Sequence, residues 1–368
     1  MSAVKLETLT PVHIGSGNFL QYNTEFVQDD MGNEPHLAVV SQEKLGKIIG
    51  EQHLDNWLEA LAKRENIKTF LKRFAPEAQT KDFAERRMPV FCKINEKDTL
   101  KECIRNGMGL PYIPGSSIKG AIRTAVLASL THQINDIETK IEVQDKQGRT
   151  TVEASQIEKE LFGSEPNSDV FRFIQVGDAY FQKDTEIATR LISLNIRRRA
   201  ERLQDDTSAQ LVEAIGTDSK STFQMQVTKS YYEFVKRLYP PMGQLPVASL
   251  DDLFHIINEF TRKLVEDEIR FWRNIDKAGG DDYVDEMEKI LQEINRCKAG
   301  VSCVLRIGHA SGWRFITGAW TEELKNFKTV VIPAAQPNYR NYVEYDFPKT
   351  RRLDEDSFIF GFVKLSMI

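Results

Sequence analysis

Residues Tyr112 to Thr124 read YIPGSSIKGAIRT, and they form the most informative stretch of the chain. A proline and a glycine end an extended segment, and Ser116 and Ser117, which are typical helix caps, follow directly. Apolar residues then recur every three or four positions, as on one face of a helix. We therefore predict a helix that begins at the serine cap and ends near Gln133.

The start of this helix carries groups that suit an anion. Backbone N–H groups at a helix N-terminus attract negative charge, and Lys119 and Arg123 lie one turn apart on one face. The spacing is not that of a nucleotide-binding P-loop, because Lys119 follows Gly115 too soon. An ordinary helix entry with solvated basic residues explains the pattern equally well, so both interpretations stay open.

The segments before this helix change from extended to helical patterns. Val4 to Ile14 predicts a strand that enters a glycine turn at Gly15-Ser16-Gly17. Further strands are predicted near Glu25–Gln28 and Leu37–Val40, and apolar spacing from Gln42 to Phe74 predicts amphipathic helices. We interpret residues from about 42 to about 110 as a helical insertion.

The second half has its own strands and helices. Residues 134–168 are polar and contain two glycines and a proline, which predicts an excursion and a linker between domains. Strands are predicted within Val170–Phe181, Ile187–Ile196, Thr222–Thr228, Val301–Ile307 and Ile359–Leu365, and helices at Tyr231–Leu238, Leu250–Trp272 and Val284–Ile294. This order favours an α+β fold with domains at residues 1–168 and 169–368, the second with a helical insertion at about 230–298.

Composition limits what the surface can do. The chain has 368 residues, with 49 Lys and Arg against 54 Asp and Glu, so its formal net charge is −5. Nonspecific coating by nucleic acid is therefore not expected, and any RNA site must be local. No apolar run suits a membrane, the first residues lack a secretory signal, and the four cysteines show no disulfide framework. We expect a protein of the reducing cytoplasm.

An arginine triplet is one candidate for such a local site. Arg197, Arg198 and Arg199 follow a strand-like segment, and the planar fork of arginine suits phosphate. Acidic residues follow within a few positions, so an exposed turn with internal ion pairs is an equally good interpretation.

A glycine-bearing loop after a strand is a second candidate. It comprises Gly308-His309-Ala310-Ser311-Gly312 and is followed by Trp313. Backbone amides of such a loop can approach phosphate, and the indole could stack on a base. A tight connection with Trp313 in the core is the competing interpretation.

Catalytic and metal chemistry have weak support. His13 could act as a general acid or base, but no second titrating partner is identifiable, and a structural role is favoured. Cys297, Cys303 and His309 recur at equal intervals without a Cys-x-x-Cys pair, so we predict no metal site and no cofactor.

Several segments together resemble one family. Leu6 to Gly17 resembles the first-strand signature of the RAMP superfamily, and the 112–124 stretch resembles its most distinctive motif. Within that superfamily the chain resembles the subunits that cap the crRNA 3′ end in type III-A (Csm) CRISPR effector complexes. The segments that match these subunits are Asp169–Asp178, Gly216–Asp218, Ile307–Gly312, Pro348–Arg352 and Gly361–Leu365.

The resemblance implies two ferredoxin-like (RRM-like) units and a non-catalytic role in crRNA binding, crRNA maturation and complex assembly. It implies crRNA, the backbone RAMP subunit and the small helical subunit as partners, with ribonucleases acting in trans and no membrane contact. The RNA-binding residues that we predict from the motifs and the resemblance are Gly15, Ser16, Gly17, Ser116, Ser117, Lys119, Arg123, Arg172, Arg197, Arg198, Arg199, Gly308, His309, Ser311, Gly312, Trp313, Arg351 and Arg352. The loop at 308–312 departs from the family pattern, which is richer in glycine and lysine.

Two rival functions remain open. A RAMP endoribonuclease that cuts precursor crRNA would cleave without metal and depend on His13. A backbone RAMP subunit that cleaves target RNA would need a catalytic aspartate in a flexible loop, for which the chain offers Asp29 and Asp30.

Overall fold

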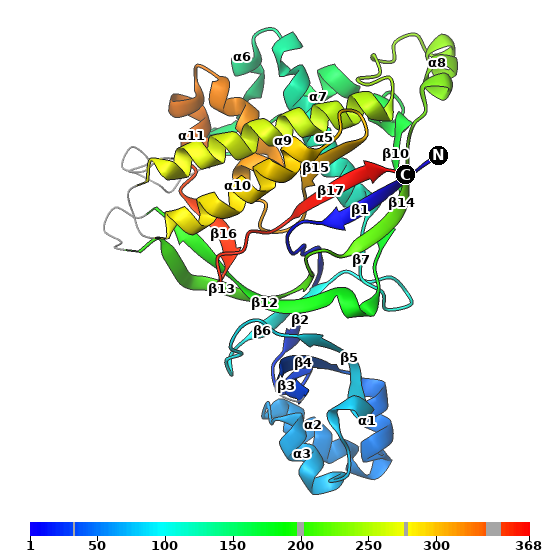
Figure 1. Cartoon of the computed structure of the whole chain (residues 1–368), viewed down its shortest axis with the longest axis vertical. Coiled ribbons are helices and arrows are strands. Elements are labelled where there is room, and N and C mark those ends of the chain that lie inside the picture. Colours follow the sequence, from blue (N-terminus) through cyan, green and yellow to red (C-terminus); the bar gives the residue numbers. More distant parts are fainter. Residues whose placement is uncertain (32–33, 197–201, 276–278, 336–346) are drawn as a thin grey trace.

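The computed structural model describes the chain except for residues 32–33, 197–201, 276–278 and 336–346. Its body contains a five-stranded antiparallel sheet, sheet A, in the order β10-β14-β1-β17-β15 (Figure 1). Val4 and Leu6 of β1 are fully buried while Lys5 between them is not, as in a half-buried strand. The strands of sheet A are β10 (Ile174–Val176), β14 (Lys220–Val227), β1 (Ser2–Thr8), β17 (Phe362–Met367) and β15 (Ser302–Arg306).

Long helices cover both faces of sheet A. Helix α5 (Gly115–Leu130) packs apolar residues such as Ile118 against Val4 and Leu6 of β1. Helix α9 (Leu250–Arg273) adds its first half to this cluster. Its second half and α10 (Gly280–Arg296) form a second cluster with Val304 and Phe362. Val304 alternates along β15 with residues of the first cluster, so the two clusters lie on opposite sides of the sheet. No helix of the described residues has the length and apolar character needed to span a bilayer.

A second five-stranded sheet, sheet B, has the order β16-β12-β13-β6-β2. Strands β13 and β6 run parallel, and the other neighbours are antiparallel. The backbone of Val12, between β1 and β2, exchanges two hydrogen bonds of 2.9 Å with Ile215 of β13, which ties sheet B to the end of β1. The strands of sheet B are β16 (Thr350–Asp354), β12 (Glu186–Asn195), β13 (Gln204–Ile215), β6 (Thr99–Cys103) and β2 (Gly15–Gln21).

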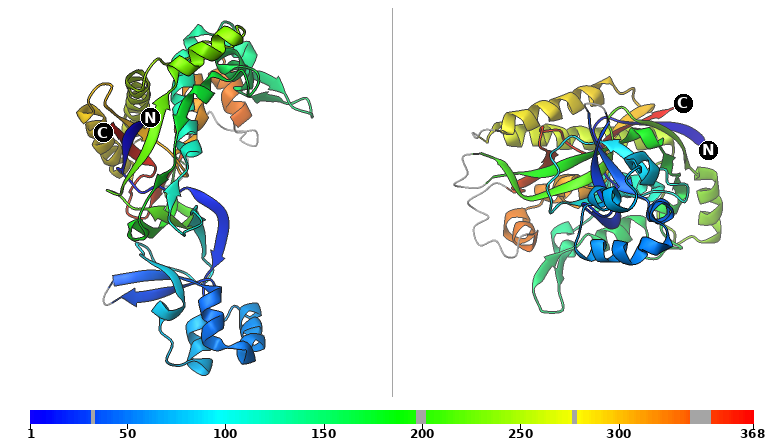
Figure 2. Two further views of the ribbon diagram at one scale, coloured as in Figure 1. Left: turned by 90° about the vertical axis from the view of Figure 1, so that its right-hand side faces the viewer. Right: turned by 90° about the horizontal axis from the view of Figure 1, so that it is seen from below.

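Residues 26–89 form a module, here called the insertion module, at one end of the long axis (Figures 1 and 2). The module has a three-stranded sheet, and its two faces pack in different hydrophobic cores. Val27 packs against the module's helices, whereas Phe26 and Met88, on the other face, pack with Leu100 and Leu211 of sheet B. The module contains β3 (Phe26–Met31), β4 (Glu34–Val40), β5 (Ala84–Pro89), α1 (Gln42–Ile49), α2 (Leu54–Ala62), α3 (Ile67–Phe74) and α4 (Thr80–Phe83). The helices predicted between residues 42 and 74 are confirmed, but the insertion is not helical beyond residue 83.

The segment 134–168 differs from the predicted linker. Ile141, Ile157 and Phe162 are fully buried in the core beside sheet A, so this excursion is packed onto the body. Val170–Phe173 forms a short 3-10 turn rather than a strand, because the Asp169 carboxylate accepts the Phe171 N–H and caps it. The elements here are α6 (Ile137–Ile141), β8 (Glu142–Gln144), β9 (Thr150–Val152), α7 (Ser155–Phe162) and a two-stranded pair of β7 (Tyr112–Ile113) and β11 (Ala179–Tyr180).

The mixed α+β class is confirmed, as are the strands predicted at 187–196, 222–228, 301–307 and 359–365. The helices predicted after residue 230 are also present, the first of them as α8 (Lys229–Leu238). Both five-stranded sheets combine strands from either side of residue 168, so the sheets do not divide at the predicted domain boundary. The domain limits themselves stay a prediction.

Candidate nucleic-acid interface

The glycine loop at residues 308–312 lies directly on the segment that joins β1 to β2. Gly308 has φ +78, and a Cβ at this position would lie 2.7 Å from the carbonyl oxygen of His13. The His309 N–H donates to the same oxygen at 2.9 Å. Such an approach requires glycine, so Gly308 serves to place His309, whose side chain reaches the surface.

His309 of this loop and three side chains linked to it directly or through Lys101 are here called the basic face: Phe19, Lys101, His309 and Arg352. Lys101 on β6 is opposite Phe19 on β2, and its Nζ lies 5.7 Å from the centre of the phenyl ring. Phe19 is 54% exposed. An exposed ring beside cations is the arrangement on which an unpaired base stacks while its phosphates meet positive charge.

The charges of the basic face act on one another. Burial and the positive charge of Arg352 lower the pKa of Lys101. Desolvation and the charges of Lys101, His13 and Arg352 lower the pKa of His309 to about 4. The imidazole is therefore neutral at pH 7 and offers a hydrogen bond rather than a charge.

His13 is a structural residue in this arrangement. Its ring is 3% exposed, and Nδ1 lies 2.6 Å from the carbonyl oxygen of Glu213. Burial lowers its pKa, which keeps the ring neutral. The expected structural role thus has a physical basis, since the ring fixes the β1–β2 connection to β13.

The start of α5 is already occupied by an anion of the chain itself. The Gly115 N–H donates to Asp178 Oδ1 at 2.7 Å, and Pro114, not a serine, is the N-cap residue. A Cβ on Gly115 would lie 2.3 Å from the Val176 carbonyl oxygen, so only glycine lets the backbone of Val176 come this close to the start of α5. The predicted serine cap is wrong, and the helix terminus is not a free phosphate cradle.

Arg123, predicted as an RNA contact, is engaged inside the body. Its guanidinium pairs with Glu158 at 2.9 Å and Asp169 at 3.0 Å, and it lies 4.4 Å from the centre of the Phe162 ring. We therefore reassign Arg123 to the packing of α7 on α5. Lys119 is half-buried over the Phe171 ring, while Ser116 is exposed and Ser117 half-buried.

Arg351 is also reassigned. Its side chain is 5% exposed, and its guanidinium binds both oxygens of Glu268, with an Nη2–Oε1 distance of 2.6 Å. Glu268 also pairs with Arg314, so one buried carboxylate serves two arginines. Arg351 therefore anchors β16 to α9 and is not presented to RNA.

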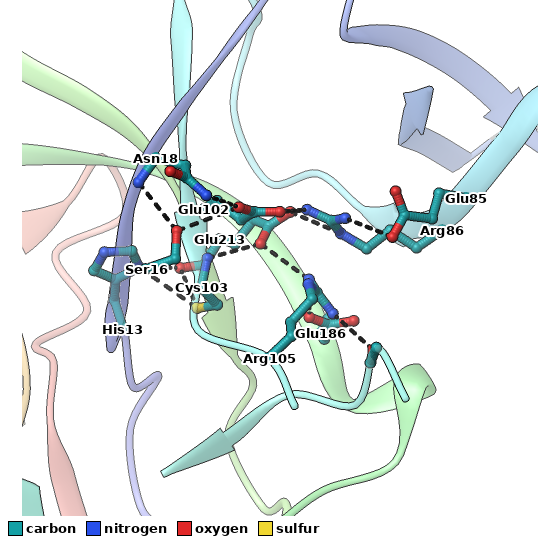
Figure 3. A network of polar contacts seen from close by, with 11 residues as sticks. His13, Ser16, Asn18, Glu85, Arg86, Glu102, Cys103, Arg105, Glu186 and Glu213 are labelled. Atoms are coloured by element: carbon teal, nitrogen blue, oxygen red, sulfur yellow. Dashed lines mark hydrogen bonds and ion pairs between the residues drawn. The ribbon is translucent and has the colours of Figure 1, made fainter. Parts of the chain in front are cut away.

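Gly15, Ser16 and Gly17 lie at the start of β2, exposed, next to a network of buried charges (Figure 3). They form the first residues of a strand rather than the turn that we predicted. The Ser16 hydroxyl donates to Glu102 at 3.2 Å.

The network itself joins the insertion module to sheet B. Glu213, which is fully buried, accepts from Arg86 of β5 at 2.7 Å and from Arg105 at 3.0 Å, and Arg105 also pairs with Glu186 (Figure 3). Buried charges need such complete pairing, because removing one partner leaves an uncompensated ion.

A family model of the RAMP superfamily matches residues 5–315. The chain belongs to the RAMP superfamily. A curated relative, "CRISPR system Cms protein Csm5" of Methanocaldococcus jannaschii, is 24% identical over 325 residues, which cover 84% of this chain and 71% of the relative. A chain of the Csm–crRNA–target RNA ternary complex of a type III-A CRISPR-Cas system has a TM-score of 0.73 at 20% identity, with all of both chains covered. Csm5 of T. onnurineus has a TM-score of 0.64 at 19% identity and covers 98% of this chain and 99% of its own.

Of the remaining residues that we predicted to bind RNA in this RAMP chain, some are buried and some are exposed. Trp313 is half-buried against Phe347, with ring centres 4.8 Å apart, which supports its core interpretation. Ser311 is buried and its hydroxyl donates to Gly308, whereas Gly312 has open space around it. Arg172 is exposed. The triplet Arg197, Arg198 and Arg199 lies outside the described residues.

Sequence reasoning missed Phe19 and Lys101, the two residues of the basic face that come from the RAMP chain's first half. Phe19 follows the predicted glycine turn by two positions, and Lys101 lies in a stretch assigned to the helical insertion. Recognising Thr99–Cys103 as a strand would have placed Lys101 on a sheet, but pairing with Phe19 depends on a contact across 82 positions of sequence.

Proposed function

We propose that this chain is a crRNA-binding subunit of a type III-A CRISPR (Csm) effector complex, of the kind represented by Csm5. It caps the 3′-end region of crRNA and is required for crRNA maturation and complex assembly in antiviral defence, in the cytoplasm. The observation that carries the proposal is the basic face, where the exposed phenyl ring of Phe19 lies 5.7 Å from the Nζ of Lys101 in a RAMP fold. The named relatives support the assignment.

We propose further that the chain contains two ferredoxin-like units. The strand order of sheet A supports this for one unit, since β10, β14, β1 and β17 are antiparallel neighbours and α5 connects β1 to β10 in the chain. A ferredoxin-like unit has its second, third, first and fourth strands in that order. Sheet B would supply the second unit.

The subunit acts without cleaving RNA in this proposal. His13 is buried against a backbone carbonyl, and Asp29 is buried and pairs with Arg87, so these two candidates from the rival functions are not free for catalysis. The side chain of Asp30, the third candidate, is not among the described ones. RNA trimming would come from ribonucleases acting in trans. The backbone RAMP subunit and the small helical subunit are the protein partners that this role requires.

The test combines Phe19→Ala with Lys101→Gln in the assembled complex. We expect crRNA of abnormal length or lower yield, because base stacking on an aromatic side chain contributes about 1–3 kcal/mol. Phe91→Ala, which removes another exposed phenyl ring outside the basic face, is the matched control. Normal crRNA in the double variant would contradict the proposal.

A further inference from the structure

The insertion module contains a surface cavity of about 460 Å³ whose lining is strongly basic. Lys68 and Lys72 come from α3, Lys81 from α4 and Arg87 from β5. Asp29 of β3 is the one carboxylate among the lining residues. None of the four residues of the basic face lines this cavity.

Asp29 is engaged by two of the four cations. It is 7% exposed, pairs with Arg87, and lies 3.6 Å from the Nζ of Lys68. Burial opposes its ionisation, but hydrogen bonds from Thr80 and Arg87 and the charges of Arg87 and Lys68 lower its pKa. The carboxylate is thus ionised at pH 7 and already neutralised.

Lys72 and Lys81 are left without a counter-charge. Both are exposed, and neither forms an ion pair with any carboxylate in the part of the chain that the structure describes. Elsewhere on the same module, Lys47 and Lys63 each pair with a glutamate one turn earlier, at 2.6 and 2.5 Å. The cavity therefore keeps a net charge of +3, from four cations and one carboxylate, and the like charges repel one another until an anion binds.

We propose that this cavity binds a phosphate of the RNA backbone, as a second RNA contact separate from the basic face. The inference rests on the proposed function and deepens it. Lysines bind phosphate as point charges without base specificity, which suits a contact to a phosphodiester. Strands β2 and β6, which carry Phe19 and Lys101, lie between the body and this module, so one strand of RNA could follow them from the basic face (Figure 1).

The experiment titrates a labelled single-stranded RNA of mixed sequence into the full chain at several salt concentrations. The test variant is Lys72→Gln with Lys81→Gln, and the matched control is Lys47→Gln with Lys63→Gln, which removes the same charge from the same module. Each lost phosphate contact flattens the log–log salt dependence by about 0.7, so we expect the slope of the test variant to be about 0.7 shallower and its affinity about fourfold weaker near 0.15 M salt. The control should match wild type.

The other results would overturn the inference. Test and wild-type RNA titrations that superimpose would show that the cavity binds no RNA, and the proposed function would remain. Loss of binding to inorganic phosphate alone, with unchanged RNA titrations, would assign the cavity to a free anion. Loss of complex assembly with unchanged RNA titrations would assign it to an acidic protein surface. Wild-type protein without measurable RNA affinity would refute the proposed function as well. If the double variant has a lowered melting temperature, each single variant replaces it, and the slope should then become shallower by less than about 0.7.

Discussion

Replacing Glu268 with glutamine should destabilise the chain by roughly 3 kcal/mol at pH 7 without changing RNA affinity. Glu268 is fully buried, and burial alone would raise its pKa. The charges of Arg351 and Arg314 outweigh burial and lower the pKa from 4.5 to about 2. At 1.36 kcal/mol for each pKa unit, this difference corresponds to about 3 kcal/mol. The estimate agrees with the cost of leaving buried arginines without their partner.

Urea unfolding followed by tryptophan fluorescence measures this effect, since Trp272 lies beside Arg351. Glu59→Gln is the control, because Glu59 forms an exposed pair with Lys63, and we expect no measurable change there. Adding Arg351→Met to Glu268→Gln should cost less than the sum of the two single changes, since both remove the same interaction. Wild-type stability of Glu268→Gln would refute the structural role of Arg351. So would a loss of RNA affinity that Glu268→Gln and Arg351→Met share.

The same carboxylate predicts a pH dependence. A carboxylate whose pKa is lower in the folded state contributes its full stability above the unfolded pKa, here about 4.5, and loses that contribution as the pH falls toward about 2. The stability difference between wild type and Glu268→Gln should therefore be constant from about pH 8 to pH 5 and shrink below that range. A difference that grows on acidification would contradict the assignment.

Three further predictions concern the loop and the helix start. RNA affinity should change less than about twofold between about pH 6 and pH 8, because His309 is already neutral there; a His309→Ala variant should show the same profile in binding titrations. Gly308→Ala should destabilise the chain by about 1–3 kcal/mol more than Gly312→Ala, since only the first places a Cβ against backbone, and equal melting temperatures would contradict this. Arg123→Glu should lower the melting temperature more than Lys119→Glu, because Arg123 pairs directly with two carboxylates and Lys119 with none in the described part of the chain; comparable melting curves would refute the packing role of Arg123.

The sequence was sufficient to predict the elements whose own residues show a regular spacing of apolar positions. The spacing of apolar residues predicted α5 and α9 to within a few residues of their observed ends, because one buried face is enough to generate the signal. Strand β13 escaped notice because its first half is polar and exposed, and β16 because it reads Thr-Arg-Arg-Leu-Asp. Both strands are defined by their neighbours in sheet B rather than by their own composition.

The candidate site shows the same limit for side chains. The glycine loop and His309 were predicted as part of the interface and lie on the basic face. In the sequence, Arg123 and Arg351 look like arginines that contact RNA. Their carboxylate partners lie 35 or more positions away in the chain, so the local sequence does not reveal the ion pairs. Without the fold, a buried arginine cannot be distinguished from an exposed one, because arginine binds carboxylate and phosphate through the same fork.

The central place of β1 in sheet A affects how the protein is made. Its two neighbours, β14 and β17, begin more than two hundred residues later, and the Ile368 N–H donates to Ala3 in this pairing. During synthesis on the ribosome, both edges of β1 therefore stay unpaired until β14 has emerged, and the edge that pairs with β17 stays unpaired until residues 362–367 have emerged. A nascent strand with open edges is prone to aggregate, so the yield of this protein should depend on how soon β17 is synthesised and on chaperones that cover β1 until then.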